Sequence, residues 1–250
     1  YGHHHREDLG EGRVNALADW IRRGRPPGPW CHDVLTPALD ALPAPVPLRA
    51  ALHGHFHYPE LIDDLLRKLA ANATPCDLLL STGTEDKAAV LRRAVRSYRQ
   101  GRVIVRVVPN RGRDVGPFLT GFAPELMGGD YDVIGHVHGK RSLFTDEAAL
   151  GESWREFLWQ NLVGGLHPMM DLVLARFSDD RSLGLVFPED PHLPDWDANR
   201  ETAEELAARM DIEGPLPPYF DFPVGTMFWA RPAALAPLFG LGLTWDDYPE

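Results

Sequence analysis

The strongest constraint on the fold is a regular alternation of strand-like and helix-like segments between residues 48 and 138. Four short segments rich in aliphatic or β-branched residues have the composition of strands: 48–56, 76–82, 102–108 and 131–138. The segments between them carry apolar residues at helical spacing, over 58–69, 85–98 and 115–122. Strands separated by helices of this length form a mostly parallel sheet with right-handed crossovers. We therefore expect an α/β domain whose sheet is flanked by helices.

After residue 140 the alternation continues less regularly. Helical spacing recurs over 152–163, 169–177, 202–210 and 232–239, and strand-like composition over 182–188 and 222–231. The run Met227-Phe228-Trp229 suits burial on both faces, so we expect 225–231, within this last segment, to be an interior strand. Gly225 opens this strand at a point where a substrate could approach the backbone closely.

The first 47 residues differ in character from the rest. They contain two short helical patterns, 14–23 and 35–42, and end in the proline-rich run 43–47, which does not continue a helix. We therefore divide the chain into an N-terminal helical and Pro-rich segment, residues 1–47, and an α/β domain, residues 48–250.

Composition excludes several classes of protein. A net charge of −11 argues against binding to nucleic acid, which needs clustered Lys and Arg. Cys31 and Cys76 stand far apart and form no metal-binding or disulfide pattern, so a reducing cytoplasm is the expected location. No stretch approaches the ~20 apolar residues of a membrane span, and any membrane contact is expected to be peripheral.

Two polar clusters follow successive strands. The turn at 110–117 holds Asn110, Arg113 and Asp114, which is more polarity than a turn requires. The strand at 131–138 runs into His136, His138 and Lys140 at alternate positions, so their side chains point the same way. Because ligands bind beyond the carboxyl ends of the strands in open α/β sheets, we expect both clusters to line one site.

The histidines at the end of the first strand, His53 and His55, are expected at the same edge. The alternative is that Asn110 and Asp114 cap a helix and that the histidines are ordinary polar residues at a sheet edge. Two such clusters after successive strands favour the shared site.

Five segments, in this order, carry a resemblance to a known family. They are HGHFHYP at 53–59, NRGRDVGP at 110–117, the strand and its end at 131–142, GLVFP at 184–188 and GTMFWARP at 225–232. These segments resemble the motifs of the rhamnan synthesis F family, over roughly residues 48–250. The resemblance implies a glycosyltransferase that assembles a bacterial cell-surface polysaccharide containing rhamnose or a related sugar. It also implies a further helix after Glu250, so the domain is expected to continue beyond this chain.

The order of elements is also similar, more weakly, to the Rossmann-like GT-A glycosyltransferase fold. In inverting enzymes of that fold an Asp-x-Asp motif at a strand end holds a divalent metal on the nucleotide diphosphate. Here His136, His138 and Lys140 stand in its place, and they are not the hard oxygen ligands that Mg²⁺ prefers. We therefore expect His136, His138, Lys140 and Arg113 to stabilise the leaving diphosphate, with Mg²⁺ or Mn²⁺ as the alternative.

The same resemblance implies an acidic general base near the end of the chain. The candidates are Asp246, Asp247 and Glu250, and Asp247 is the best match because an aromatic residue and a proline follow it. The alternative is that this acidic run is a solvated turn. Gly225, Thr226 and Trp229 are expected on the acceptor side.

The predicted partners are a nucleoside-diphosphate sugar and a glycan acceptor, which could be lipid-linked, at the inner face of the membrane. Two other functions stay open. The first is a non-catalytic carbohydrate-binding or scaffold domain, because the Asp-x-Asp motif is missing. The second is a metallohydrolase, for which the candidate ligands are His53, His55, His57, His136 and His138.

Overall fold

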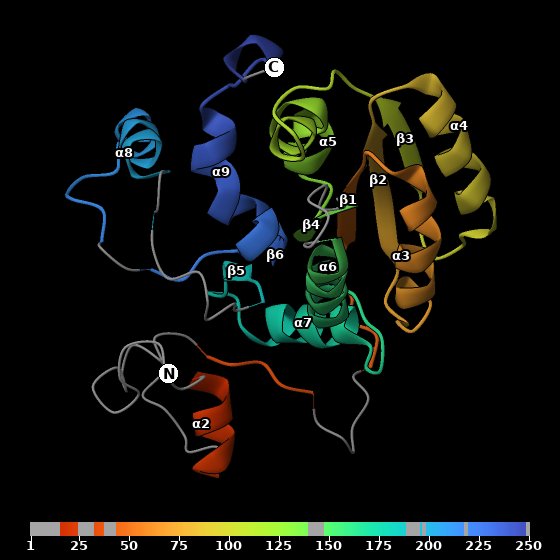
Figure 1. The fold of residues 1–250 in the computed structure, drawn as a ribbon, viewed down its shortest axis with the longest axis horizontal. Helices are drawn as coiled ribbons and strands as arrows, with labels where there is room; N and C mark the ends of the chain where they lie inside the picture. Colours follow the sequence, from red (N-terminus) through yellow and green to blue (C-terminus); the bar gives the residue numbers. More distant parts are fainter. Residues whose placement is uncertain are drawn as a thin grey trace.

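The structure is a computed structural model, and it describes residues 16–24, 33–37, 44–139, 148–188, 196, 199–217 and 220–248. Figure 1 shows one sheet between two layers of helices, with the short helix α2 (Ala16–Arg22) lying apart from them. Among the described residues, no helix is long and apolar enough to cross a membrane.

The sheet has six strands in the order β3-β2-β1-β4-β6-β5. Their bounds are β1 Ala50–Phe56, β2 Cys76–Thr82, β3 Val103–Val107, β4 Val133–Gly139, β5 Leu185–Val186 and β6 Phe228–Ala230. The pairs β3-β2, β2-β1 and β1-β4 are parallel, whereas β6 runs antiparallel to both β4 and β5. The predicted α/β fold with a mostly parallel sheet is confirmed, and β6 is an interior strand as expected.

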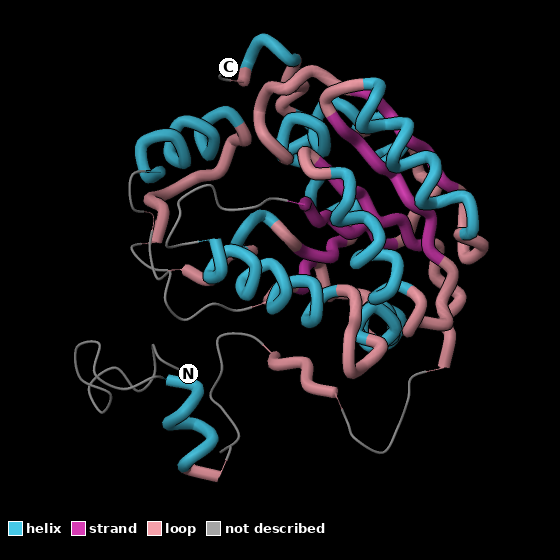
Figure 2. The backbone as a smooth tube through the Cα atoms, turned by 45° about the vertical axis from the view of Figure 1, so that its right-hand side comes forward, coloured by secondary structure: helices cyan, strands magenta, loops and turns pink. Residues whose placement is uncertain are grey.

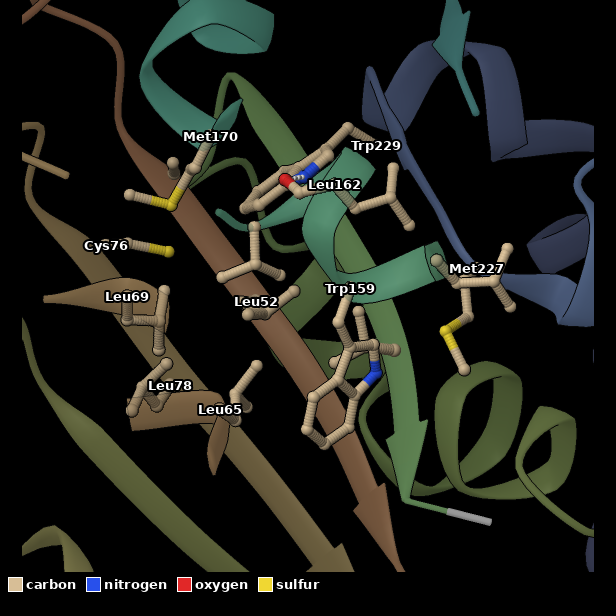
Figure 3. Close-up of a cluster of buried hydrophobic side chains, with 14 of the residues drawn as sticks. Leu52, Leu65, Leu69, Cys76, Leu78, Trp159, Leu162, Met170, Met227 and Trp229 are labelled. Atoms are coloured by element: carbon tan, nitrogen blue, oxygen red, sulfur yellow. Dashed lines mark hydrogen bonds between the residues drawn. The ribbon is translucent and has the colours of Figure 1, made fainter. Parts of the chain in front are cut away.

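One face of the sheet is covered by four helices that pack on the larger core (Figures 1 and 3). They are α3 (Ile62–Leu69), α4 (Glu85–Ala94), α6 (Ala148–Leu162) and α7 (Met169–Asp179), with short 3-10 turns at Pro59–Leu61 and Val95–Ser97. Strand positions facing this layer include Gly135, where a Cβ atom would lie 2.8 Å from the rings of Trp229. A glycine is therefore needed there to seat the tryptophan against the sheet.

The opposite face carries a smaller core under η3 (Pro117–Gly121), α5 (Ala123–Met127) and α9 (Pro232–Gly240). The sequence predicted one regular helix over 115–122, but η3 is a single π-helical turn that leads into α5. Pro117 and Pro124 stand at the start of these two elements, where a missing N–H costs no helical hydrogen bond. In Figure 2 these helices and the sheet are seen from a second direction.

Two predicted elements differ in the structure. The strand expected at 182–188 has only two residues, and the guanidinium of Arg231 bonds the carbonyls of Phe177, Asp180 and Leu183 just before it. The strand expected at 222–231 begins only at Phe228, because Val224–Thr226 forms a 3-10 turn. The remaining elements are α8 (Arg200–Arg209) and the 3-10 turn η6 (Trp245–Asp247).

Parts of the segment before residue 48 pack on the domain. Leu35 and Val46 contact the larger core, and Arg176 of α7 forms an ion pair of 2.7 Å with Asp33. Residues 33–37 are not helical, and the rest of the helix predicted at 35–42 lies outside the described residues. The division of the chain at residue 47 stays a prediction.

Candidate active site at the carboxyl ends of the strands

Four histidines lie together near the carboxyl ends of β1 and β4. In the parallel register His53 pairs with His136, and His55 pairs with His138. Side chains that pair across a sheet, or stand two positions apart on a strand, share a face, so all four rings project from one face. Their exposed fractions lie between 0% and 8%. The rings of His53 and His136 stack, and the ring of Phe118 from η3 packs against both.

Hydrogen bonds connect these histidines to Asp114, in the loop after β3. The Nδ1 atoms of His53 and His136 lie 2.9 Å apart, and Nε2 of His136 lies 3.4 Å from Oδ2 of Asp114. The hydroxyl of Thr226, in the turn before β6, donates to the same carboxylate oxygen. Asp114 and His136 come from the two polar clusters that the sequence indicated, and the structure brings them together.

Ser81, near the end of β2, extends this chain of hydrogen bonds. Its Oγ lies 3.2 Å from Nε2 of His53 and 3.0 Å from Nδ1 of His55. One assignment of protons satisfies every bond with neutral histidines: His55 donates to Ser81, Ser81 to His53, His53 to His136, and His136 to Asp114. Because every donor in this order points toward Asp114, the chain stabilises a negative charge on that carboxylate.

The pKa values of these groups are consistent with this order. Burial, followed by the proximity of His136, lowers the pKa of His53, and burial lowers the pKa of His55 to about 4. Burial by itself would raise the pKa of Asp114, but the hydrogen bond from His136 and the proximity of His138 lower it overall. At neutral pH the site therefore holds neutral His53 and His55 near an ionised carboxylate.

The loop that carries Asp114 has an unusual backbone. Gly112 and Arg113 have φ angles of 67° and 53°, in the left-handed region that glycine adopts readily and arginine does not. The side chain of Asp114 bonds His136 and Thr226, and η3 has no side-chain cap. The alternative that Asp114 caps a helix is therefore not what the structure shows.

The turn before β6 is held at the site from two sides. Gly225 and Thr226 have φ angles of 61° and 57°, and for a β-branched residue this conformation costs about 1–2 kcal/mol. Nε2 of His138 donates to the carbonyl oxygen of Gly225 at 2.8 Å, while Thr226 donates to Asp114. The strained turn thus brings a predicted acceptor-side residue, Thr226, against the predicted donor-side residue Asp114.

The acidic turn near the end of the chain packs on the loop at 110–117. A Cβ atom at Gly112 would lie 2.6 Å from the ring of Tyr248, and one at Gly116 would lie 3.3 Å from the ring of Trp245. Both glycines therefore leave room for aromatic rings. Nη1 of Arg111 lies 3.1 Å from Oδ1 of Asp246, whose side chain is 96% exposed.

Asp247, the predicted base, serves as a cap in the structure. Its Oδ2 accepts hydrogen bonds from the backbone N–H of Thr244 at 2.7 Å and from the hydroxyl of Thr244 at 2.8 Å. These bonds lower the pKa of Asp247. The geometry agrees with the alternative of a solvated turn, while the catalytic role stays a prediction.

The remaining predicted residues are placed as follows. Asn110 and Arg113 are exposed in the loop that carries Asp114. Trp229 is fully buried in the larger core, where its indole N–H donates to the carbonyl of Leu162, so it lies on the opposite face from the histidines. Lys140 and Glu250 lie outside the described residues.

Sequence reasoning missed Ser81. Its signal was the polar pair Ser81-Thr82 at the end of an otherwise apolar strand, next in the sheet to the strand that ends in histidines. Thr82 has a structural role, since its hydroxyl donates to the carbonyl of Phe56 at 2.7 Å.

The described residues of this site do not fit a resident metal ion. Both ring nitrogens of His136 are hydrogen bonded within the protein, and so is Nε2 of His138. In the part of the chain that the structure describes, no group of three or more His, Cys, Asp or Glu side chains is arranged to hold a metal. Of the histidines that a metallohydrolase would need, His53, His55, His136 and His138 instead bond one another, Ser81, Asp114 and the backbone.

Comparison with solved structures gives a distant match. A mannosyltransferase from Pyrobaculum calidifontis, PcManGT, solved with GDP-Man and Mn²⁺, matches with a TM-score of 0.42 and 13% sequence identity. The match covers 89% of this chain and 53% of that protein.

Comparison with protein families and curated proteins gives closer matches. WxcX proteins from two strains of Xanthomonas campestris pv. campestris are 29% identical over 191 residues, which is 74% of this chain and 26% of the relatives. The chain thus spans about a quarter of the length of these relatives. The family model of rhamnan synthesis protein F matches residues 35–250. The chain therefore belongs to the rhamnan synthesis protein F family, as its five ordered motifs indicated.

Proposed function

We propose that this chain is part of a glycosyltransferase that moves rhamnose or a related sugar from a nucleoside-diphosphate donor to a growing cell-surface polysaccharide, with inversion. The observation that carries this proposal is the family match over residues 35–250. The cluster of polar side chains at the carboxyl ends of β1, β2 and β4 supports it, because this is the edge where open α/β sheets bind ligands.

In this proposal Asp114 binds a hydroxyl group of the donor. Its Oδ2 already accepts bonds from His136 and Thr226, whereas the structure shows no bond from a described residue to Oδ1. A carboxylate with a lowered pKa stays ionised and accepts a hydrogen bond without removing the proton. The donor contact therefore suits Asp114 better than the role of general base does.

The other assignments follow the sequence. Arg113, exposed beside Asp114, is proposed to contact the diphosphate, and Asp247 is proposed as the base that removes the acceptor's proton. The proposed acceptor is a glycan, and the proposed location is the cytoplasmic face of the membrane.

A non-catalytic binding domain is the second candidate. It is favoured by the hydrogen-bonded histidines His136 and His138 in place of a metal-binding acidic pair. Both candidates predict ligand binding at the strand ends, and only the first predicts turnover.

Donor binding is tested by a thermal-shift screen of nucleoside diphosphates and their sugars. A ligand that binds only the native state raises the melting temperature, by an amount that grows with its concentration. A concentration-dependent rise for one nucleotide, lost in Asp114→Ala, is expected. If no nucleotide or nucleotide sugar raises the melting temperature, the proposed donor class is wrong.

A further inference from the structure

Arg155 occupies a position in α6 where an apolar residue is expected. It shares an inward-facing stripe with Trp159 and Leu162, four and seven residues further on, and both of these are fully buried in the larger core. The side chain of Arg155 is itself only 7% exposed. Arginine keeps its charge in proteins, so a guanidinium in this position needs an anionic partner.

The contacts that the structure shows for this guanidinium do not supply one at hydrogen-bond distance. Nη2 of Arg155 lies 3.8 Å from a carboxylate oxygen of Glu152, whose side chain is 75% exposed. The guanidinium also lies over the ring of Trp159, 5.5 Å from its centroid. Among the described residues, the buried Nε of Arg155 and the buried Nε1 of Trp159 both lack a hydrogen-bond partner. Two neighbouring buried donors are thus unsatisfied.

These donors lie toward the carboxyl ends of the strands. Leu162 accepts a bond from Trp229, which pairs with Gly135 in the middle of β4. One turn earlier, the ring of Trp159 contacts that of Phe56, the last residue of β1. Figure 3 shows Trp159 lying near the arrowheads of β1 and β4, with its ring nitrogen turned toward the side of Met227. Arg155 lies one turn further in the same direction.

The residue before Arg155 in α6 reaches the turn that borders the histidine site. This residue, Trp154, packs against Gly225, where a Cβ atom would lie 3.1 Å from the tryptophan ring. The carbonyl of the same Gly225 accepts the bond from His138. A ligand bound at the strand ends can therefore meet Asp114 on one face of the sheet and Arg155 on the other.

We propose that Arg155 and Trp159 bind a phosphate group of the substrate, and that this group is the diphosphate of the nucleotide-sugar donor. The identity of the anion rests on the proposed function, whereas the anion site rests on the two unsatisfied donors. Guanidinium matches phosphate oxygens in geometry and charge, and the indole N–H adds a neutral donor.

Isothermal titration calorimetry tests the proposal with UDP, GDP, TDP and inorganic pyrophosphate as separate probes. Arg155→Gln is expected to weaken binding roughly 10- to 100-fold. Arg155→Lys should weaken binding by a smaller factor, because lysine keeps the positive charge and loses only the paired N–H donors of the guanidinium. Trp159→Phe keeps a ring and removes one neutral donor, so a loss of roughly 2- to 10-fold is expected. Arg92→Gln, on the exposed side of α4, is the control for the loss of one positive charge and should bind as the wild type does.

These measurements test the anion site and the proposed donor class separately. If a nucleoside diphosphate binds equally well to the wild type and to Arg155→Gln, the anion site is overturned and the donor class stands. If only pyrophosphate binds, and binding depends on Arg155, the anion site stands and the donor class falls. If no probe binds, both are overturned. A lower melting temperature in Arg155→Gln with unchanged affinities would assign Arg155 a structural role and also overturn the proposal.

Discussion

Acid should destabilise this protein well above the pH at which carboxylates titrate, because burial lowers the pKa of both His53 and His55. His55 is 8% exposed, and burial lowers its pKa from 6.5 to about 4. Between these two pH values the unfolded chain binds a proton that the folded protein does not, so stability is complete above pH 6.5 and falls as the pH drops toward 4. The loss from His55 alone reaches about 3 kcal/mol, at 1.36 kcal/mol for each pKa unit.

Substitution of His55 by asparagine isolates this contribution. The amide of asparagine reaches the position of Nδ1, which bonds Ser81 in the wild type, and carries no titrating group. Urea unfolding at several pH values between 4.5 and 6 should show a dependence on pH that is shallower by up to about 1.4 kcal/mol per unit in His55→Asn. His53, whose pKa is also lowered by burial, continues to contribute with the same sign.

His57→Asn is the matched control, because His57 is exposed two residues further along the chain. It removes an exposed imidazole from the same segment of chain and leaves the bond between His55 and Ser81 in place. An identical dependence in His55→Asn and the wild type would show that His55 is charged in the folded protein, and the order of hydrogen bonds from His55 to Asp114 would then be refuted.

Three further predictions concern the site itself. Arg113→Ala should weaken donor binding roughly 10- to 100-fold by calorimetry with little change in melting temperature, since its exposed side chain contributes little to folding; equal affinities would remove Arg113 from the site. Glycosyl transfer should survive EDTA, because the ring nitrogens of His136 are already hydrogen bonded, and restoration of a chelated enzyme by Mg²⁺ or Mn²⁺ alone would contradict this. Asp247→Asn should keep donor binding and lose on the order of 10²–10⁴ in turnover if Asp247 is the base; normal turnover, with a collapse in Glu250→Gln, would transfer the role to Glu250.

Much of the fold could be predicted from the sequence, because its strands and helices differ clearly in period and composition. The strand predicted at 76–82 matches β2 residue for residue, and the run Met227-Phe228-Trp229 correctly indicated an interior strand. The meeting of Asp114 with His136 was also predictable, since the carboxyl ends of parallel strands share one edge.

What the sequence did not indicate depends on contacts between distant residues. The turn at Gly225 and Thr226 replaces strand structure because His138 and Asp114 bond it from outside. Ser81 joins the site only because β2 pairs with β1 in a register that sets Ser81 against His55. Local spacing carries no information on either contact, and an acidic residue such as Asp247 looks the same in a sequence whether it caps a turn or removes a proton.

Glycosyl transfer by the full-length protein distinguishes a glycosyltransferase from a binding domain. The nucleoside diphosphate released from a nucleotide sugar is measured with and without the polysaccharide acceptor, in the wild type and in Asp114→Asn. We expect release that depends on the acceptor and falls on the order of 10- to 100-fold in Asp114→Asn, because a charged hydrogen bond to the donor is lost. If the protein binds nucleotide sugar or glycan and releases no nucleoside diphosphate, it is a binding domain and the proposed transferase function is wrong.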